Sequence, residues 1–394
     1  MLFSLEKRKD IDMENTESKK IKILHCSDIH LDAPFVGLTT DKMDERRREL
    51  RATFMRMMEF IRDRGVDYVL ISGDLFETRF ATNTTAEILI REFRSTPDTK
   101  FIIAPGKHDC YRDNPIYSSG RLPENCYVFN QETLSRFDFE DDRLTVYGWA
   151  FVNDTLIESP ITCNRVDDSS KINIVCGYCD LDGEIDSTDC PIASADLARF
   201  GADYYAFGGK HEKTDFVKKS GHMYSYSGSL ECTGFDEPYI GGVKFLNIEY
   251  NDGELAVDSK NISFGRVRFV TRQIDITGVD GNNEITNRIS KLIGTERYGT
   301  DTALRVELVG SIDPRFIVPT HIECDAFGLY FFDMVDKTMP LWNTEHFKRD
   351  MSMAGEVYRR LLPMMERGRE DDKLLAARAF RVALAALENR EIDL

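Results

Sequence analysis

Basic residues are scarce in this chain of 394 residues. Its 51 lysines and arginines stand against 68 aspartates and glutamates, which gives a formal net charge of −17 at pH 7. A field of that sign repels phosphate backbones, because generic nucleic-acid binding depends on clustered cations. A nucleic-acid substrate would therefore need a bound cation, a local basic strip or the surface of a partner.

One basic strip is present, in a segment at 44–65 with helical periodicity. Such a strip is ordinarily the solvated face of a helix, and a binding face is the alternative interpretation. The residues concerned are Arg46, Arg47, Arg48, Arg51, Arg56, Arg62 and Arg64.

Long hydrophobic runs are also missing. No apolar stretch approaches the length that crosses a bilayer, and residues 1–20 are too charged for a signal peptide, so we expect a disordered leader there. The nine cysteines show neither paired CxxC motifs nor the density of a disulfide scaffold. These absences favour a reduced, cytoplasmic setting without a membrane.

Strands and helices alternate through the first part of the chain. Apolar runs at 21–28, 66–74 and 99–106 are separated by helical segments at 44–65 and 84–95. This alternation predicts βαβ crossovers and a sheet covered by helices. Further along, strand-like runs dominate and predict a second, β-rich sheet packed on the first.

The length of the chain predicts more than one domain, because a single core seldom grows so large. We expect a main α/β domain at 21–265 and a β-α-β unit at 266–345. Residues 346–394 are predicted to form two C-terminal helices, the second with a broad Leu, Ala and Phe stripe.

Side chains that bind metals follow several predicted strands. Asp28 and His30 follow the first strand, Asp74 follows the second, and His211 follows a later one. Loops at the carboxyl ends of neighbouring strands converge on one crevice, so we expect these groups to meet although each alone would be an ordinary turn residue. Two carboxylates and two imidazoles suit Mn²⁺, Fe²⁺ or Zn²⁺. The remaining histidines lack this context and are predicted to be structural: His25, His222, His321 and His346.

In order and spacing, these blocks resemble the signature of the calcineurin-like metallophosphoesterases, which is D-x-H, G-D, G-N-H-D, an isolated His, and G-H-x-H. The matching stretches are DIH at 28–30, GD at 73–74, GKHD at 106–109, the CG of IVCGY at 176–177 and GGKH at 208–211. The resemblance implies an α/β fold, a four-layer α-β-β-α sandwich, with a C-terminal α+β appendage.

A closer likeness within this superfamily is to the DNA repair exonucleases of the SbcD and YhaO type. It is carried by HCSDIHLDAPFVGL at 25–38 and by YSGSLECTGFDEPYIGGVKFLNIE at 226–249. The resemblance implies that the unit at 266–345 caps the site or contacts DNA. It also implies an SbcC-like ATPase partner through which DNA would be bound, and it is compatible with a homodimer.

The family pattern uses two metal ions. Carried over to this sequence, the first ion keeps all its ligands, which are Asp28, His30, His211 and the bridging Asp74. The second ion loses its own ligands, because Lys107, Cys176 and Gly209 stand where the pattern has Asn, His and His. The resemblance thus implies one retained ion, with manganese favoured and iron or zinc open.

Lys107 has two interpretations. A protonated lysine has no lone pair and cannot ligate a metal, but its ammonium could replace the charge of the second ion, facing Asp74. The alternative is a decayed second site with Lys107 turned to solvent.

The resemblance assigns the protonation of the leaving oxygen to His108, with Asp109 orienting its ring. The function implied is that of a metal-dependent phosphodiesterase or DNA exonuclease with weakened activity. Two alternatives remain: an inactive homologue that serves as a structural or DNA-end-sensing subunit, and a hydrolase for a small phosphate ester or nucleotide.

Overall fold

The computed structural model describes residues 20–388, except 36–37, 185, 220–221, 252–253, 314–315, 317 and 320–326. The predicted leader therefore lies outside the described residues apart from Lys20, and so do His321 and Cys324. The chain divides into two compact units, Met1–Arg266 and Val267–Leu394. Each unit is described by itself.

The first sheet of the first unit has the strand order β14-β13-β1-β2-β3-β4. The strands β1 to β4 are parallel, and the hairpin β13-β14 adds antiparallel to β1. Their bounds are β1 Lys20–Cys26, β2 Tyr68–Ile71, β3 Lys100–Ile103, β4 Cys126–Val128, β13 Gly242–Asn251 and β14 Glu254–Ser263. The predicted alternation of strands and helices is confirmed here.

The second sheet has the order β11-β12-β10-β7-β6-β5, with antiparallel pairing only at its two edges. Its strands are β5 Ser135–Phe139, β6 Leu144–Gly148, β7 Ile172–Tyr178, β10 Tyr204–Gly208, β11 Val217–Lys219 and β12 His222–Tyr226. Short elements lie in the connections within each sheet. They are α3 Pro115–Ser118 between β3 and β4, the 3₁₀ turn η1 Glu140–Asp142 between β5 and β6, and β8 Asp180–Leu181 and β9 Pro191–Ile192 between β7 and β10.

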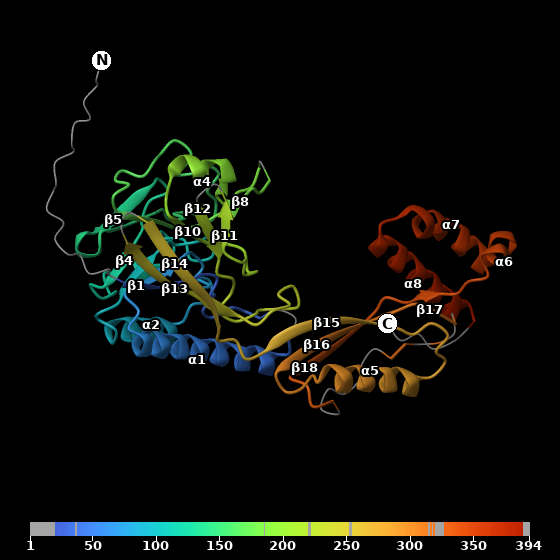
Figure 1. Ribbon diagram of the computed structural model, residues 1–394. Helices are drawn as coiled ribbons and strands as arrows, with labels where there is room; N and C mark the ends of the chain where they lie inside the picture. The colour runs from blue at the N-terminus through green and yellow to red at the C-terminus, as the bar shows by residue number, and fades with distance from the viewer. Residues whose placement is uncertain are drawn as a thin grey trace, which may run out of the picture. The chain divides into compact units, whose positions relative to one another are not determined.

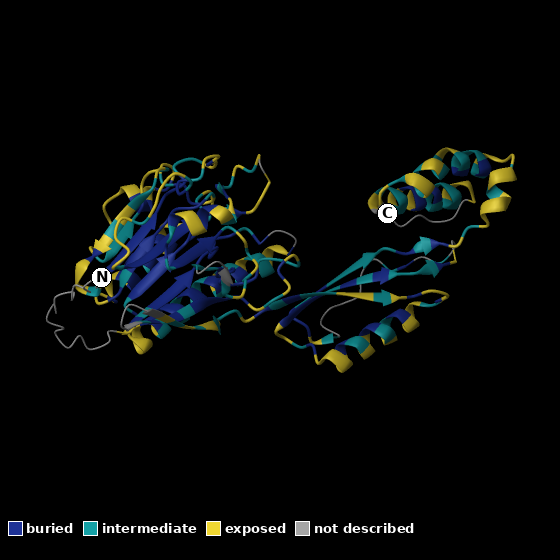
Figure 2. Ribbon diagram, turned by 45° about the horizontal axis from the view of Figure 1, so that its top comes forward, coloured by how far each residue is buried: buried dark blue, intermediate teal, exposed yellow. Residues whose placement is uncertain are grey.

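Alternate side chains of the two sheets form one core between them. Ile21 and Ile23 of β1 meet Ile172 and Ile174 of β7 in a single buried cluster, as the two-residue period of strands requires. The strands of both sheets are accordingly the most buried part of the unit (Figure 2).

Helices cover the outer faces of both sheets. The helices α1 (Thr40–Arg64) and α2 (Asn83–Arg94) lie against the first sheet, where Phe93 of α2 stacks on Phe101 of β3 with ring centroids 4.1 Å apart. The short helix α4 (Ser194–Phe200) covers the second sheet, and its Phe200 packs against Tyr147 (Figure 1). The predicted four-layer α-β-β-α sandwich is confirmed.

The second unit contains a three-stranded parallel sheet in the order β15-β16-β18. The helix α5 (Asn282–Glu296) connects the first two strands and buries Ile285, Ile289 and Ile293 at helical spacing. The strands are β15 Arg268–Asp275, β16 Thr302–Val309 and β18 Phe331–Asp336, beside the small pair β17 Ser311–Ile312 and β19 Met339–Pro340. The predicted β-α-β order is present.

The prediction of two C-terminal helices was wrong, because the chain forms three: α6 Thr344–Arg349, α7 Met353–Arg367 and α8 Glu370–Leu387. The side chain of Ser352 accepts a hydrogen bond from the backbone N–H of Gly355 and so begins a new helix after Asp350. Within the described residues, no helix is both long and apolar enough to cross a membrane.

Candidate metal centre

The candidate ligands lie on loops that leave parallel strands at one end of the sandwich. Asp28, His30 and Asp74 have left-handed backbone conformations, with φ of 49°, 47° and 52°. Such angles are costly for residues other than glycine and tend to occur at functional sites. Backbone hydrogen bonds from Asp28 N to Gly73 O (3.1 Å) and from His30 N to Asp74 O (2.9 Å) join the first two loops.

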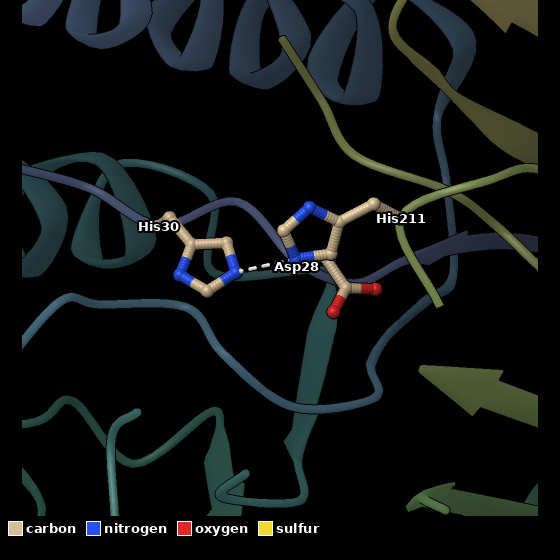
Figure 3. A group of neighbouring side chains, drawn as sticks. All are labelled: Asp28, His30 and His211. Carbon is tan, nitrogen blue, oxygen red and sulfur yellow. Dashed lines mark hydrogen bonds between the residues drawn. The ribbon is translucent and has the colours of Figure 1, made fainter. Parts of the chain in front are cut away.

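Three of the four predicted ligands of the first ion converge directly. Asp28, His30 and His211 each offer one ligand atom, and these atoms lie within 4.8 Å of one another (Figure 3). The Nε2 atoms of the two histidines are 3.1 Å apart. The fourth residue, Asp74, places Oδ2 3.7 Å from His30 Nε2. The loops therefore bring together the groups that the sequence separates by up to 183 positions.

A carboxylate contacts the Nδ1 atom of each imidazole, on the side of the ring opposite the candidate ligand atom Nε2. The Nδ1 atom of His211 lies 2.6 Å from Glu237 Oε1, and Nδ1 of His30 lies 3.5 Å from Glu77 Oε2. Glu237 is itself fixed, since Thr233 donates to it through its backbone N–H and its hydroxyl. Outer carboxylates of this kind direct the opposite ring nitrogen toward a metal and raise its basicity. Neither glutamate was predicted from the sequence.

Asp28 is also held in place. Its two carboxylate oxygens accept hydrogen bonds from Gly209 N at 3.1 and 3.2 Å, and one accepts from the Ser27 hydroxyl. Gly209 therefore serves the first ion's site through its backbone although it has no side chain to ligate.

The site concentrates negative charge away from water. Asp28, Asp74 and Asp109 are all buried. Burial, and then the charges of Asp109 and Asp28, raise the pKa of Asp74 well above its usual value. A divalent cation between Asp28, Asp74 and the two imidazoles would offset this repulsion, and the O and N donors suit such an ion. The residues therefore fit one metal ion.

A second group of donors shares His30. It consists of His30, Glu77 and His108, whose candidate ligand atoms also lie within 4.8 Å of one another. His108 Nδ1 is 3.0 Å from Glu77 Oε2, and the rings of His108 and His30 meet edge to face at 5.0 Å. Burial would raise the pKa of the Glu77 carboxyl, but hydrogen bonds from His108 and His30 outweigh it and lower the pKa to about 2. Glu77 is thus an ionised acceptor for both rings.

The part of the chain that carries these candidate ligands matches a family model. The model of the calcineurin-like phosphoesterases matches residues 21–213, which include every candidate ligand. Residues 21–213 belong to the calcineurin-like phosphoesterase family.

Curated relatives agree with this assignment. An uncharacterized metallophosphoesterase, YhaO of Bacillus subtilis, is 26% identical over 203 residues, which cover 49% of this chain and 49% of the relative. The DNA double-strand break repair protein Mre11 of Thermoplasma acidophilum is 25% identical over 290 residues, or 68% of this chain and 72% of the relative. The match thus spans about half the length of the Bacillus protein.

Among solved structures, a dimetal phosphatase from Danio rerio aligns with 62% of this chain and 99% of its own. The identity is 10% and the TM-score is 0.39.

Asp109 does not orient His108, contrary to the expectation from the family resemblance. Its carboxylate is fully buried and accepts four hydrogen bonds, from the backbone N–H groups of Gly106 (2.6 Å), Asp74 (3.1 Å) and Leu75 (3.0 Å) and from the Tyr117 hydroxyl (2.5 Å). These bonds tie two of the phosphoesterase loops together, so Asp109 shapes the site, and Glu77 takes the place beside His108.

Lys107 does not face Asp74 either. Its Nζ lies 2.7 Å from Asp189 Oδ1, and both side chains are 35% exposed. The reason is electrostatic: an ammonium gains more from a partly solvated carboxylate than from entering a buried site that it cannot ligate. The ammonium therefore does not stand in for a second ion against Asp74. The alternative of a decayed second site stays open, with Lys107 paired to Asp189 at a partly solvated position.

Cys176 belongs to the core rather than to the site. It lies in the cluster between the two sheets, with Sγ 3.4 Å from the Ser72 hydroxyl. The residue of β7 that reaches the loops is Tyr178, two positions further along the same face. The alternation of the strand explains the shift, because residues 172, 174, 176 and 178 share a face and only the last passes the sheet edge.

The basic strip of α1 is largely engaged within the chain. Arg46 is fully buried and pairs with Glu49 (2.7 Å) and Glu231 (3.1 Å). The next members also have partners, since Arg47 bonds Ala33 O and Asp44, and Arg51 pairs with Asp32. The strip holds α1 to its surroundings and offers few charges to a ligand.

Proposed function

We propose that this chain is a metal-dependent phosphodiesterase of the DNA nuclease type that works with one divalent ion, preferably Mn²⁺. The observation that carries the proposal is the convergence of the buried Asp28 and His30 with the partly exposed His211, with Asp74 beside them and His108 at the exposed side. The side chain of His108 is 44% exposed, so a substrate can reach it.

A divalent ion at this set would polarise a phosphate oxygen and lower the pKa of a bound water. The chain's own part is to hold the donors rigidly. Glu77 and Glu237 fix the two imidazoles, and the Gly209 N–H and the Ser27 hydroxyl fix Asp28. Because these donors are already positioned before a substrate binds, they do not have to reorganise during the reaction.

His108 is the proposed proton donor for the leaving oxygen. Its Nδ1 lies 3.0 Å from Glu77 Oε2, which orients the ring and leaves Nε2 to face the substrate. The ring also lies against His30, so the donor stands next to the metal set.

DNA is the proposed substrate because the named Mre11 relatives are DNA double-strand break repair proteins. The net charge of −17 opposes DNA binding by this chain alone, and the arginines of α1 are mostly paired. We therefore propose that an ATPase subunit of the SbcC type supplies the DNA affinity.

The test compares hydrolysis by wild type, His108→Ala and the control His346→Ala, whose histidine is exposed on α6. Linear duplex DNA, single-stranded DNA and a bis-aryl phosphate are incubated with Mn²⁺, and the DNA is supplied at concentrations high enough to offset its weak binding to this chain alone. The proposal expects DNA degradation that His108→Ala reduces by about 10²–10⁴-fold and that His346→Ala leaves unchanged. Turnover of the bis-aryl phosphate alone would indicate a small-ester hydrolase, and no turnover with any divalent ion would indicate a silent homologue.

A further inference from the structure

The position of a second metal ion is where this site departs most from the family pattern. By the family pattern, a second ion would share Asp74 and take ligands from positions 107 and 209 and from the end of β7. Lys107 is bound to Asp189, and Gly209 has no side chain. The residue at the end of β7 is Tyr178.

The Tyr178 ring fills the space between three of the motif loops. A Cβ atom placed on Gly73 would lie 2.7 Å from Tyr178 Cδ2, and one placed on Gly106 would lie 2.8 Å from the same atom. A Cβ on Gly209 would lie 2.9 Å from Cζ. Contacts this short mean that the ring is packed directly on the backbone of all three loops, so no room remains there for a hydrated ion and its ligands.

The ring is held rigidly from its other side. Tyr178 is buried, and Phe151 packs on it edge to face with centroids 5.0 Å apart. Its carbonyl oxygen accepts a hydrogen bond from Trp149 Nε1 at 3.1 Å. A side chain fixed by an aromatic neighbour and a backbone anchor does not leave its position without disturbing the core.

We infer that Tyr178 takes the place of a second metal ion, so that this chain binds one ion and closes the neighbouring position with an aromatic ring. The family's second ion does not fit the residues present. This inference rests on the proposed one-ion function and identifies the residue that enforces it.

The inference also explains the two neighbours of Tyr178. With the ring in place, the space beside Asp74 is filled, and Lys107 pairs with Asp189 instead. Gly209 has φ of 101° and stands against the ring, so any larger residue there would be strained and would clash. The absence of metal ligands at positions 209 and 107 thus follows from the Tyr178 ring and does not need two separate explanations.

The experiment counts Mn²⁺ ions per chain by equilibrium dialysis with elemental analysis, and detects coupled ion pairs by electron paramagnetic resonance. Three proteins are compared: wild type, Tyr178→Phe, which keeps the ring, and Lys107→Asn/Tyr178→His, which removes the ring and supplies an amide oxygen and an imidazole. We expect one ion in the first two proteins and a second, spin-coupled ion in the third. Circular dichroism and thermal melting establish that each variant is folded.

The outcomes separate the inference from the proposed function. Two tightly bound ions in the wild type would overturn the inference and leave a phosphodiesterase intact. A folded Lys107→Asn/Tyr178→His protein that still binds one ion would also overturn it. No bound ion in the wild type would overturn the proposed function itself. If the double variant does not fold, the wild-type count and the anomalous density of a Mn²⁺-soaked crystal still decide between one ion and two.

Discussion

The Oε2 atom of Glu77 lies 3.0 Å from Nδ1 of His108 and 3.5 Å from Nδ1 of His30. One carboxylate therefore orients both the proposed proton donor and a proposed metal ligand. A change at Glu77 should therefore affect both the metal set and His108.

Replacing Glu77 with Gln should impair both functions. The amide keeps the shape but loses the charge that fixes the two rings, so we expect Mn²⁺ affinity and kcat for phosphodiester hydrolysis each to fall by about 10–100-fold. Titration calorimetry and steady-state kinetics measure the two effects. Glu87→Gln, on the exposed side of α2, is the control and should change neither. Wild-type kinetics in Glu77→Gln would contradict this role.

Mn²⁺ should stabilise the protein through Asp28. An ion that binds only the folded state adds about 2.7 kcal/mol to the free energy of unfolding when its free concentration is about 100 times its Kd. We expect Mn²⁺ to raise the melting temperature of the wild type and EDTA to reverse the rise. Asp28→Asn should abolish the response, whereas Asp154→Asn, at an exposed position, should keep it. An equal Mn²⁺ response in Asp28→Asn would place the ion elsewhere.

Asp109 should contribute to the free energy of unfolding, although its position in the motif suggests a role in catalysis. Asp109→Asn turns an amide N–H₂ toward groups that now donate to a carboxylate, and each buried donor left without an acceptor costs about 1–3 kcal/mol. We expect the free energy of unfolding, from urea denaturation in EDTA, to fall by about 2–5 kcal/mol. His108→Ala, at a half-exposed neighbouring position, should change it by less than about 1 kcal/mol. Equal effects of the two variants would refute this division of roles.

The sandwich could be predicted from the sequence because local patterns determine it. Apolar runs of strand length separated by helical segments specify the parallel strands, and the parallel order brings Asp28 and Asp74 to the same edge. His211 follows β10 of the other sheet and still arrives at the same place, because the two sheets stack with their carboxyl ends together. The sequence could therefore predict that these candidate ligands at strand ends lie close together.

The supporting residues could not be found in this way. Glu77 and Glu237 lie in loops where nothing in the local pattern separates them from other acidic residues, and only tertiary contacts make them partners of His30 and His211. The Lys107 pairing depends on Asp189, 82 positions away. Tyr178 did carry a signal, because the alternation of β7 places it on the face of Cys176 and closer to the strand end.

The buried His25 should make stability depend on pH in mildly acidic solution. Its ring lies between the sheets, with Nδ1 2.8 Å from the Tyr204 hydroxyl and Nε2 3.2 Å from the Phe207 carbonyl oxygen. Burial, and then the positive charge of Lys244, lower the pKa of His25 from 6.5 to about 3. The folded chain thus keeps the ring neutral, whereas the unfolded chain protonates it below pH 6.5. The stability that the neutral ring contributes is complete above pH 6.5 and is lost as the pH falls toward 3, by at most about 1.4 kcal/mol per pH unit.

A variant without a titrating group at position 25 removes this dependence. His25→Gln should be less stable than the wild type near neutral pH, because it loses packing between the sheets, but the difference should shrink by about 2 kcal/mol between pH 6.5 and pH 5. Urea denaturation at several pH values in EDTA measures the difference, and His346→Gln, at an exposed position, should show none of this trend. A constant difference between wild type and His25→Gln across this range would mean that the ring is already protonated in the folded protein, and the hydrogen bonds to Tyr204 and Phe207 would then have to be assigned to an imidazolium.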